Sequence, residues 1–326
     1  MATAHPSRAV TVSVPATSAN LGPGFDCLGL ALDLRNEITF VTGENLVAAS
    51  DLTAYNVTAT GVDAEKVPLD RGNLAIVAAE TVFRLAGRRP AAVDIRLNNC
   101  IPVGSGLGSS SSAIIGGLAA ANALAGGDLT TGQLLQIAVE MEGHPDNVAP
   151  AMLGGLVLGV LPDAADGPGE LIVRRWEPPP WTAVVVLPDF HLLTSEARAA
   201  LPDTVGRGDV IFNASRLALL LHALTTGDLD LLPVAMGDRL HQPHRLKIIP
   251  GATEAYRAAY EAGAAGVALS GAGPSLIAFT PSEGQAIGQA MSEAFAAAGL
   301  GSRMWALKPT SEGVRLRVIV AGDRDI

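Results

Sequence analysis

A glycine-rich segment at residues 102–112 constrains this chain more than any other part of the sequence. It reads Pro-Val-Gly-Ser-Gly-Leu-Gly-Ser-Ser-Ser-Ser, and a run of small apolar residues follows it. Glycine lets the backbone approach a ligand closely, and serine side chains cap the free N–H groups at the start of a helix. Such N–H groups bind anions. The segment predicts a phosphate-binding loop between a strand and a helix, with a plain helix-initiating turn as the simpler alternative.

The spacing of these glycines excludes three other loops. A dinucleotide-binding loop needs glycine where Ser109 stands, and a Walker loop needs a Gly-Lys-Ser/Thr run that the segment lacks. A hydrolase nucleophile elbow needs glycine two residues before and after its serine, and neither Ser105 nor Ser109 has that pair. Only Lys66, Lys247 and Lys308 are lysines, so we expect arginine and backbone N–H groups to bind anions.

Composition narrows the class of protein further. A chain of 326 residues is long enough for about two domains. Its net charge of −10 argues against nucleic acid as a partner, because that binding depends on Lys and Arg. Every apolar stretch is interrupted before it is long enough to span a membrane. The first ten residues lack the pattern of a secretory signal and only two cysteines occur, so we expect a cytoplasmic protein.

Strand and helix patterns are interleaved along the chain. Strands are predicted at residues 10–14, 36–41, 93–97, 183–187, 267–270, 276–280, 301–307 and 313–320. Helices are predicted at residues 71–85, 109–124, 131–142, 209–225, 229–239 and 252–263. A stretch rich in Pro, Gly and Asp at 161–180 predicts a boundary between two domains, residues 1–170 and 171–326. The second domain is expected to be α+β with a mostly antiparallel sheet.

Residues 102–113 resemble the phosphate-binding motif of the GHMP kinases, which include galactokinase, mevalonate kinase and phosphomevalonate kinase. Two further segments resemble motifs of that family in the same order, Pro15–Asp26 and Ser270–Ser275. The first of these and the segment Glu142–Pro150 are most similar to the homoserine kinase branch. The resemblance implies an α+β fold of two domains, with an active site in the cleft between them. The N-terminal domain would resemble a ribosomal small-subunit protein, and the C-terminal domain would be ferredoxin-like.

The resemblance also implies a reaction, the transfer of the γ-phosphoryl group of ATP to the side-chain hydroxyl of L-homoserine. The product, O-phospho-L-homoserine, would serve threonine biosynthesis. Such a transfer depends mainly on positioning and on neutralising phosphate charge. Ser110 would bind Mg²⁺ or phosphate, and Glu140 would be the acidic Mg²⁺ ligand, with Glu142 as the alternative. The residues expected to bind ATP are Pro102, Val103, Gly104, Ser105, Gly106, Leu107, Gly108, Ser109, Ser110, Ser111 and Ser112.

Homoserine is a zwitterion, so its pocket must offer oxygen atoms to the ammonium group and cations to the carboxylate. By the resemblance, Asn20 and Asp26 would hold the amino-acid end, while Thr194, Arg198 and Arg245 would face the carboxylate. The spacing of Thr194 and Arg198 places both side chains on one face of a helical turn. Arginine suits the task because its planar guanidinium pairs with a carboxylate through two hydrogen bonds.

Three polar residues lie in a predicted loop over the reacting hydroxyl. The resemblance assigns Asn147 to orient this hydroxyl and places His144 near it. Asp146 is either a base or a cap for the next segment. The pair His241 and His244 is spaced like metal ligands, but the proline between them breaks the helical spacing, so we expect no metal there.

Two other functions stay open at this stage. One is a GHMP kinase with a different alcohol substrate, which the set of acidic and arginine residues disfavours. The other is a GHMP-fold protein that binds a ligand without catalysis, which the intact glycine-rich loop disfavours. Homodimers are common in the family, so a second copy of the chain is a candidate partner.

Overall fold

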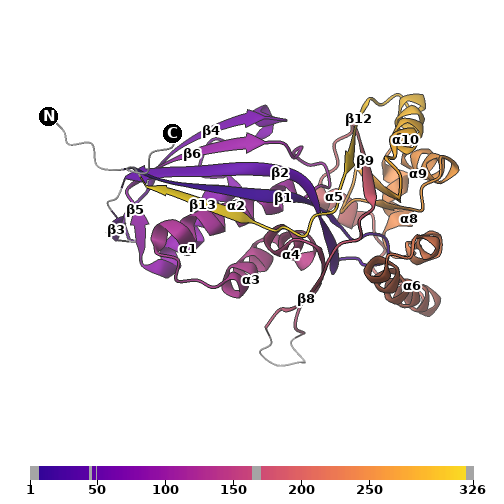
Figure 1. Cartoon of the computed structure of the whole chain (residues 1–326), viewed down its shortest axis with the longest axis horizontal. Coiled ribbons are helices and arrows are strands. Elements are labelled where there is room, and N and C mark those ends of the chain that lie inside the picture. Colours follow the sequence, from indigo (N-terminus) through magenta and orange to yellow (C-terminus); the bar gives the residue numbers. More distant parts are fainter. Residues whose placement is uncertain (1–6, 44–45, 49, 164–169, 321–326) are drawn as a thin grey trace.

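The computed structural model describes residues 7–43, 46–48, 50–163 and 170–320. They form two parts along the long axis of the molecule, each built around one main β-sheet (Figure 1). The first part carries the long strands and the helices α1 to α4, and the second carries the helices from α5 onward. Within the described residues, no helix is long and apolar enough to cross a membrane.

The sheet of the first part has the order β13-β1-β2-β6-β4, and β7 and β8 extend it from β2. Strands β4 and β6 are parallel, and the other pairs are antiparallel. A separate small pair joins β3 (Leu46–Ala48) and β5 (Arg88–Pro90). The strands of the main sheet are β1 (Ser7–Ala19), β2 (Leu28–Gly43), β4 (Ala54–Gly61), β6 (Ala92–Asn99), β7 (Leu156–Val160), β8 (Ile172–Trp176) and β13 (Arg315–Val320).

One face of this sheet is covered by helices. In β6 the buried side chains Val93, Ile95 and Leu97 alternate with exposed ones, because successive residues of a strand point to opposite faces. The buried face packs against α1 (Leu74–Ala86), α2 (Ser109–Ala125), α3 (Thr131–Glu142) and α4 (Pro145–Leu153), seen below the sheet in Figure 1. Local sequence sets these helix ends. Thr130 and Gln133 form a reciprocal cap at the start of α3, and Gly87 ends α1 in the left-handed conformation.

The sheet of the second part has the order β10-β11-β9-β12 and is antiparallel throughout, as predicted. Every residue of β9, β10 and β11 is buried, because helices pack on both faces. The strands are β9 (Thr182–Pro188), β10 (Gly266–Leu269), β11 (Leu276–Thr280) and β12 (Ser302–Leu307). The helices are α5 (Thr194–Ala199), α6 (Arg207–Thr226), α7 (Leu232–Ala235), α8 (Gln242–Ile248), α9 (Ala252–Glu261) and α10 (Gln285–Ala297).

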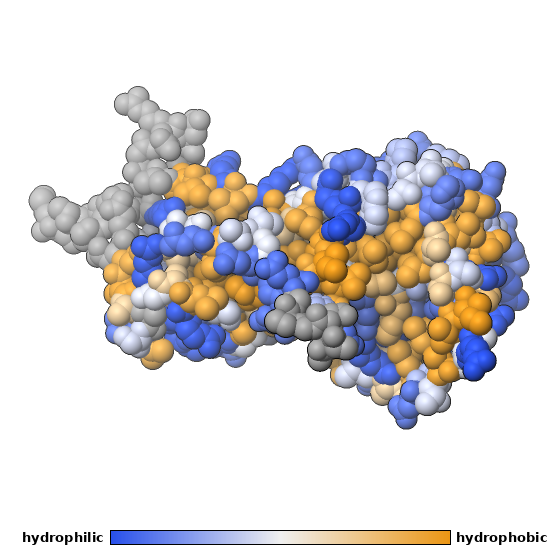
Figure 2. All heavy atoms as spheres, turned by 90° about the horizontal axis from the view of Figure 1, so that it is seen from below, coloured by the Kyte–Doolittle hydropathy of each residue, from blue (hydrophilic) through white to orange (hydrophobic). Residues whose placement is uncertain are grey.

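A shared hydrophobic core joins the two parts. Leu28, Leu30 and Leu32 of β2 belong to the same buried cluster as Val185 of β9 and Leu220 of α6. The other face of the second sheet packs separately against α9 and α10. Seen from below, apolar side chains also gather on the surface of the second part (Figure 2). The shared core holds the loops of the two parts at fixed positions relative to each other.

Three predictions about elements need correction. The helix predicted at 229–239 is wrong, because Pro233 and Gly237 break the segment into a 3₁₀ turn (Leu229–Leu231), the short α7 and a loop. The loop predicted around His144 is instead the start of α4, since proline is tolerated in the first helical turn. The division at residue 170 does not follow the sheets, because β8 and β13 belong to the first. Residues 164–169 of the predicted boundary lie outside the described residues.

Candidate active site

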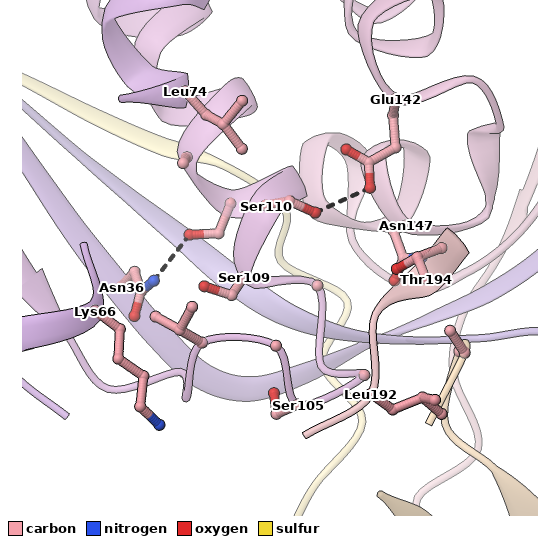
Figure 3. A pocket seen from close by; sticks show the side chains of 18 of the residues that line it. Asn36, Lys66, Leu74, Ser105, Ser109, Ser110, Glu142, Asn147, Leu192 and Thr194 are labelled. Carbon is pink, nitrogen blue, oxygen red and sulfur yellow. Dashed lines mark hydrogen bonds between the residues drawn. The ribbon is translucent and has the colours of Figure 1, made fainter. Parts of the chain in front are cut away.

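A cavity of about 340 Å³ lies between the two parts, lined by segments of both. The first part supplies the glycine-rich loop, the start of α2 and the segment that leads into α4. The second part supplies Leu192, Thr194, Arg198, Arg245 and the turn at residues 271–273. Figure 3 shows the arrangement around the loop, with Lys66 and Leu74 on one side and Glu142 and Thr194 on the other. The cavity has three regions, which we call the apolar end, the glycine-loop end and the charged end. Each is defined by its residues below.

The glycine-loop end is formed by the glycine-rich loop, Ser109, Ser110 and Glu142. Gly104, Gly106 and Gly108 have φ angles of 67°, 79° and 71°, in the left-handed region that side chains disfavour. The loop also lies close to the second part, since the Ser270 hydroxyl donates a hydrogen bond of 2.7 Å to the Gly106 carbonyl. A Cβ atom on Gly106 would lie 2.3 Å from the Ser270 carbonyl oxygen. These positions therefore require glycine.

Helix α2 begins at the cavity with no side chain capping it. Its N-cap residue is Gly108, which offers no side-chain oxygen to the first N–H groups. The predicted loop residues that line the cavity are Val103, Gly104, Ser105, Gly106, Gly108, Ser109, Ser110 and Ser112. Pro102, Leu107 and Ser111 instead lie behind the lining, and the Pro102 carbonyl accepts a 2.8 Å hydrogen bond from Ser105. The uncapped N–H groups of this helix start lie at the cavity, an arrangement suited to an anion.

The acidic side chain that contacts Ser110 at this end is Glu142, the alternative to Glu140 in the sequence expectation. The Ser110 hydroxyl donates a 2.9 Å hydrogen bond to Glu142 Oε1 (Figure 3). Glu140 is exposed and accepts a hydrogen bond from Gln136 on its own helix. Residues two positions apart point to nearly opposite sides of an α-helix, so only one of the pair can face Ser110. The Ser110 hydroxyl and Glu142 carboxylate are oxygen donors of the kind that Mg²⁺ prefers, so these two residues fit that ion.

The apolar end of the cavity was not predicted from the sequence, because its residues form no compact motif. Its apolar lining is Ile38, Val67, Pro68, Leu74 and Leu97, and its polar lining is Lys66, Asn73 and Asn99. Asp63 connects this end to the loop, since one carboxylate oxygen accepts the Val103 N–H at 3.1 Å and the other pairs with Lys66 at 3.2 Å. Asn73 caps the start of α1, and this helix-capping asparagine was the one local sequence signal that could have indicated the apolar end.

The charged end brings together residues predicted from three separate segments. Arg198 of α5 donates two hydrogen bonds of 2.8 Å to the two carboxylate oxygens of Asp26. Asn20 supports this pair, because its side-chain oxygen accepts the Asp26 N–H at 2.9 Å and its amide donates to the Gly271 carbonyl at 2.9 Å. Thr194, one helical turn before Arg198, lines the same cavity. The expected face of α5 is therefore the one turned to the cavity.

Arg245 of α8 is the second guanidinium at the charged end. It is only 2% exposed, and its Nε and Nη1 donate to the carbonyls of Ala197 and Gly271 at 3.2 and 3.3 Å. Burial, with a smaller effect of the positive charge of Arg198, lowers the pKa of Arg245 to about 10. The guanidinium therefore remains charged at neutral pH and favours an anionic ligand beside it.

His144, Asp146 and Asn147 complete the charged end where it meets the glycine-rich loop. His144 Nδ1 lies 2.5 Å from Asp146 Oδ1, and the Thr17 hydroxyl donates a 2.8 Å hydrogen bond to Asn147 Oδ1. Burial disfavours the charged form of His144, but the hydrogen bond to Asp146 and the nearby carboxylates outweigh it and raise the pKa of His144. Side-chain ligand atoms of Asp26, His144 and Asp146 lie within 4.8 Å of one another, so the two carboxylates lie close to the imidazole.

Comparisons of the sequence with known proteins show which family the chain resembles. The model described as "GHMP kinases N terminal domain" matches residues 73–155, and "GHMP kinases C terminal" matches residues 220–297. The chain is 45% identical to the homoserine kinase of Moorella thermoacetica over 93% of this chain and 98% of that protein. It is 48% identical to the homoserine kinase of Gloeobacter violaceus, over 86% of this chain and 91% of that protein.

Solved structures give the same result. The crystal structure of homoserine kinase from Cytophaga hutchinsonii superposes with a TM-score of 0.82 at 30% identity, covering 95% of this chain and 97% of that chain. The mevalonate kinase of L. major, in complex with R-mevalonate, has a TM-score of 0.64 at 15% identity. This match covers 92% of this chain and 96% of that one, and at this identity it indicates a shared fold only.

Proposed function

The chain belongs to the homoserine kinase branch of the GHMP kinase family, and we propose that it transfers the γ-phosphoryl group of ATP to the side-chain hydroxyl of L-homoserine. The product is O-phospho-L-homoserine, which serves threonine biosynthesis. One observation supports this substrate above others. The charged end presents a carboxylate and two guanidinium groups a short distance from an anion-binding helix start, so it matches a zwitterion that carries a phosphate acceptor.

At the glycine-loop end, the backbone of residues 104–108 and the start of α2 would bind the phosphates of ATP. We place the nucleoside at the apolar end, where Leu74 and Leu97 offer contact area and Asn73 and Asn99 offer hydrogen bonds. Ser110 and Glu142 are the residues that would hold Mg²⁺, and not Ser110 with Glu140. When bound, this ion neutralises charge on the phosphate oxygens.

At the charged end, the substrate would exchange partners with an existing ion pair. The ammonium group would take the place of Arg198 beside Asp26, supported by Asn20, and the carboxylate would take the place of Asp26 beside Arg198. Arg245 and Thr194 would complete the carboxylate site. Because a zwitterion replaces both halves of this half-exposed pair, neither Asp26 nor Arg198 is left without a partner of opposite charge.

The hydroxyl of the substrate would then point toward Asn147, at the start of α4. An amide is no base, so we assign Asn147 to orienting the hydroxyl and keep His144 beside it. Asp146 is 2% exposed and pairs with His144, so we favour its role in holding that ring over a role as general base. Mg²⁺ as the metal, a cytoplasmic location and a homodimer belong to the same proposal.

The test is ADP release by the purified chain with ATP and Mg²⁺ on L-homoserine, mevalonate, galactose, shikimate and L-serine. We expect turnover chiefly on L-homoserine, and Glu142→Gln provides a matched control for contaminating kinases. Turnover chiefly on another alcohol would overturn the substrate. ATP binding without turnover on any of the five would favour the non-catalytic binding protein instead.

A further inference from the structure

One aromatic ring contacts both guanidinium groups of the charged end. The Cζ atoms of Arg198 and Arg245 lie 5.6 and 5.1 Å from the centroid of the Phe25 ring. Both distances are within the range in which the negative face of an aromatic ring attracts a cation. Phe25 directly precedes Asp26, the residue that pairs with Arg198. The position of the Phe25 ring is therefore coupled to Asp26, its neighbour in the chain, and to Arg198 and Arg245, which it contacts.

The imidazole of His241 stacks on the Phe25 ring. The two rings are stacked, with centroids 5.1 Å apart and planes inclined by 28°. His241 is fully buried, and its Nε2 lies 2.8 Å from the Gly22 carbonyl while its Nδ1 lies 3.5 Å from Arg245 Nη1. These partners match a neutral imidazole that donates from Nε2 and accepts at Nδ1. Its position is thus determined by the same turn that carries Phe25 and by the arginine that Phe25 contacts.

Two like charges close together repel each other, and Arg198 is one of the groups that disfavour the charged form of Arg245. A carboxylate that binds both guanidinium groups needs them at a set separation before it arrives. An aromatic face offsets the repulsion without offering the hydrogen bonds of a competing carboxylate. A leucine or methionine at position 25 would fill space but would supply no such attraction.

We propose that Phe25, held by His241, is a positioning residue that sets the separation of Arg198 and Arg245 and thereby determines specificity for a substrate carboxylate. The inference rests on the proposed function, in which these arginines bind the carboxylate of homoserine. It goes beyond that function because it assigns discrimination between a carboxylate and a neutral group to a side chain that offers the substrate no hydrogen bond.

The experiment compares L-homoserine with L-homoserine amide, in which the carboxylate is replaced by a neutral carboxamide. For Phe25→Leu we expect a KM for L-homoserine raised about tenfold, with kcat and the KM for ATP nearly unchanged. The amide makes no use of the paired cations, so the preference for homoserine over the amide, as a ratio of kcat/KM values, should fall about tenfold. Phe25→Tyr keeps the aromatic face and should restore the preference. Phe25→Met removes the ring in a second way if the leucine variant fails to fold.

Phe212→Leu is the matched control. The Phe212 ring also contacts two guanidinium groups, with Arg216 and Arg239 at 3.8 and 4.1 Å, but it lies on α6 and neither of these arginines lines the cavity. Its loss should leave the preference unchanged. Equal losses on both substrates in Phe25→Leu, or an unchanged preference, would overturn the inference while leaving the proposed function intact. Failure of the wild-type chain to use L-homoserine would instead overturn the proposed function.

Discussion

The glycine-loop end and the charged end of the cavity are built in different ways. The first is made mainly of backbone groups from one continuous segment, whose shape depends on glycines with positive φ angles. The second is made of side chains from segments far apart in the chain, Asn20 and Asp26 near one terminus and Arg198 and Arg245 in the other part. The comparison teaches that a backbone site is specified locally, while a side-chain site exists only once both parts have assembled.

The two ends also differ in what a ligand must displace. The start of α2 has no side-chain cap, so an anion meets N–H groups that are already directed at it. At the charged end, Asp26 and Arg198 satisfy each other until a zwitterion takes both places. We therefore expect the charged end to discriminate by charge and the glycine-loop end to depend on shape.

The largest expected effect is at the charged end. Arg198→Ala removes one partner of the proposed carboxylate contact, which costs on the order of 2–4 kcal/mol and raises the KM for L-homoserine about 30- to 900-fold. The KM for ATP should change little, as measured by steady-state kinetics. Arg198→Lys keeps the charge but loses the planar fork, so it should recover only part of the loss. An unchanged KM for homoserine would remove Arg198 from the site.

At the glycine-loop end, Gly106→Ala tests the dependence on backbone shape. The new Cβ atom would lie 2.3 Å from the Ser270 carbonyl oxygen, so the loop must move, and kcat/KM for ATP should fall about 100-fold. Gly104→Ala is the control, because its Cβ would meet no atom within 4 Å and only the cost of the left-handed conformation remains, about 1–2 kcal/mol of stability. Equal kinetic losses in the two variants would argue against a role for the contact with Ser270.

Glu142→Gln tests the one carboxylate of the glycine-loop end. We expect the apparent affinity for Mg²⁺ to fall about tenfold, with kcat partly restored at high Mg²⁺ concentration, measured by titration of the ion at saturating ATP. Glu140→Gln on the same helix should behave like the wild type, because its carboxylate hydrogen-bonds to Gln136 instead. The opposite result in these two variants would return the metal ligand to Glu140.

The smallest effect concerns His144, between the two ends. Its pKa is raised in the folded protein above the ordinary value of 6.5, so its contribution to stability is complete below that pH and is lost as the pH rises through the folded pKa. Urea unfolding from about pH 6 to 9 should therefore show a steeper loss of stability for the wild type than for His144→Gln. His222→Gln, at an exposed histidine of α6, should follow the wild type. Parallel curves for wild type and His144→Gln would contradict this linkage.

The comparison of the glycine-loop end with the charged end also explains which parts of the site the sequence predicts. The glycine-rich loop and the helix after it were predicted from local spacing, because glycine conformation is a local effect. The expected serine cap was wrong, since the N-cap residue of α2 is Gly108 and no side chain caps the helix. The joint exposure of Thr194 and Arg198 to the cavity also follows from spacing within one helix. Glu140 and Glu142 could not be separated, since nothing in the sequence sets the rotation of α3 relative to α2.

Other features depend on contacts that no local pattern encodes. The segment with His144 and Asn147 was predicted as a loop, yet Pro145 occupies the first turn of α4, which is packed between the sheet and α3. Lys66 and Asn73 reach the cavity from a segment about 30 residues before the loop, where the sequence shows no motif. The contact of Phe25 with Arg245 joins residues of both parts and depends on the shared core.

The pairing of β13 with β1 has a consequence for how the molecule is made. These two strands are residues 315–320 and 7–19, so β1 pairs along one side with a strand that is synthesised about 300 residues later. Until β13 has been made, β1 presents unpaired N–H and C=O groups along that side, and such an edge is a template for pairing with other chains. A nascent chain stalled before β13 would therefore be more prone to aggregation than one that has passed it, even with its glycine-rich loop already folded.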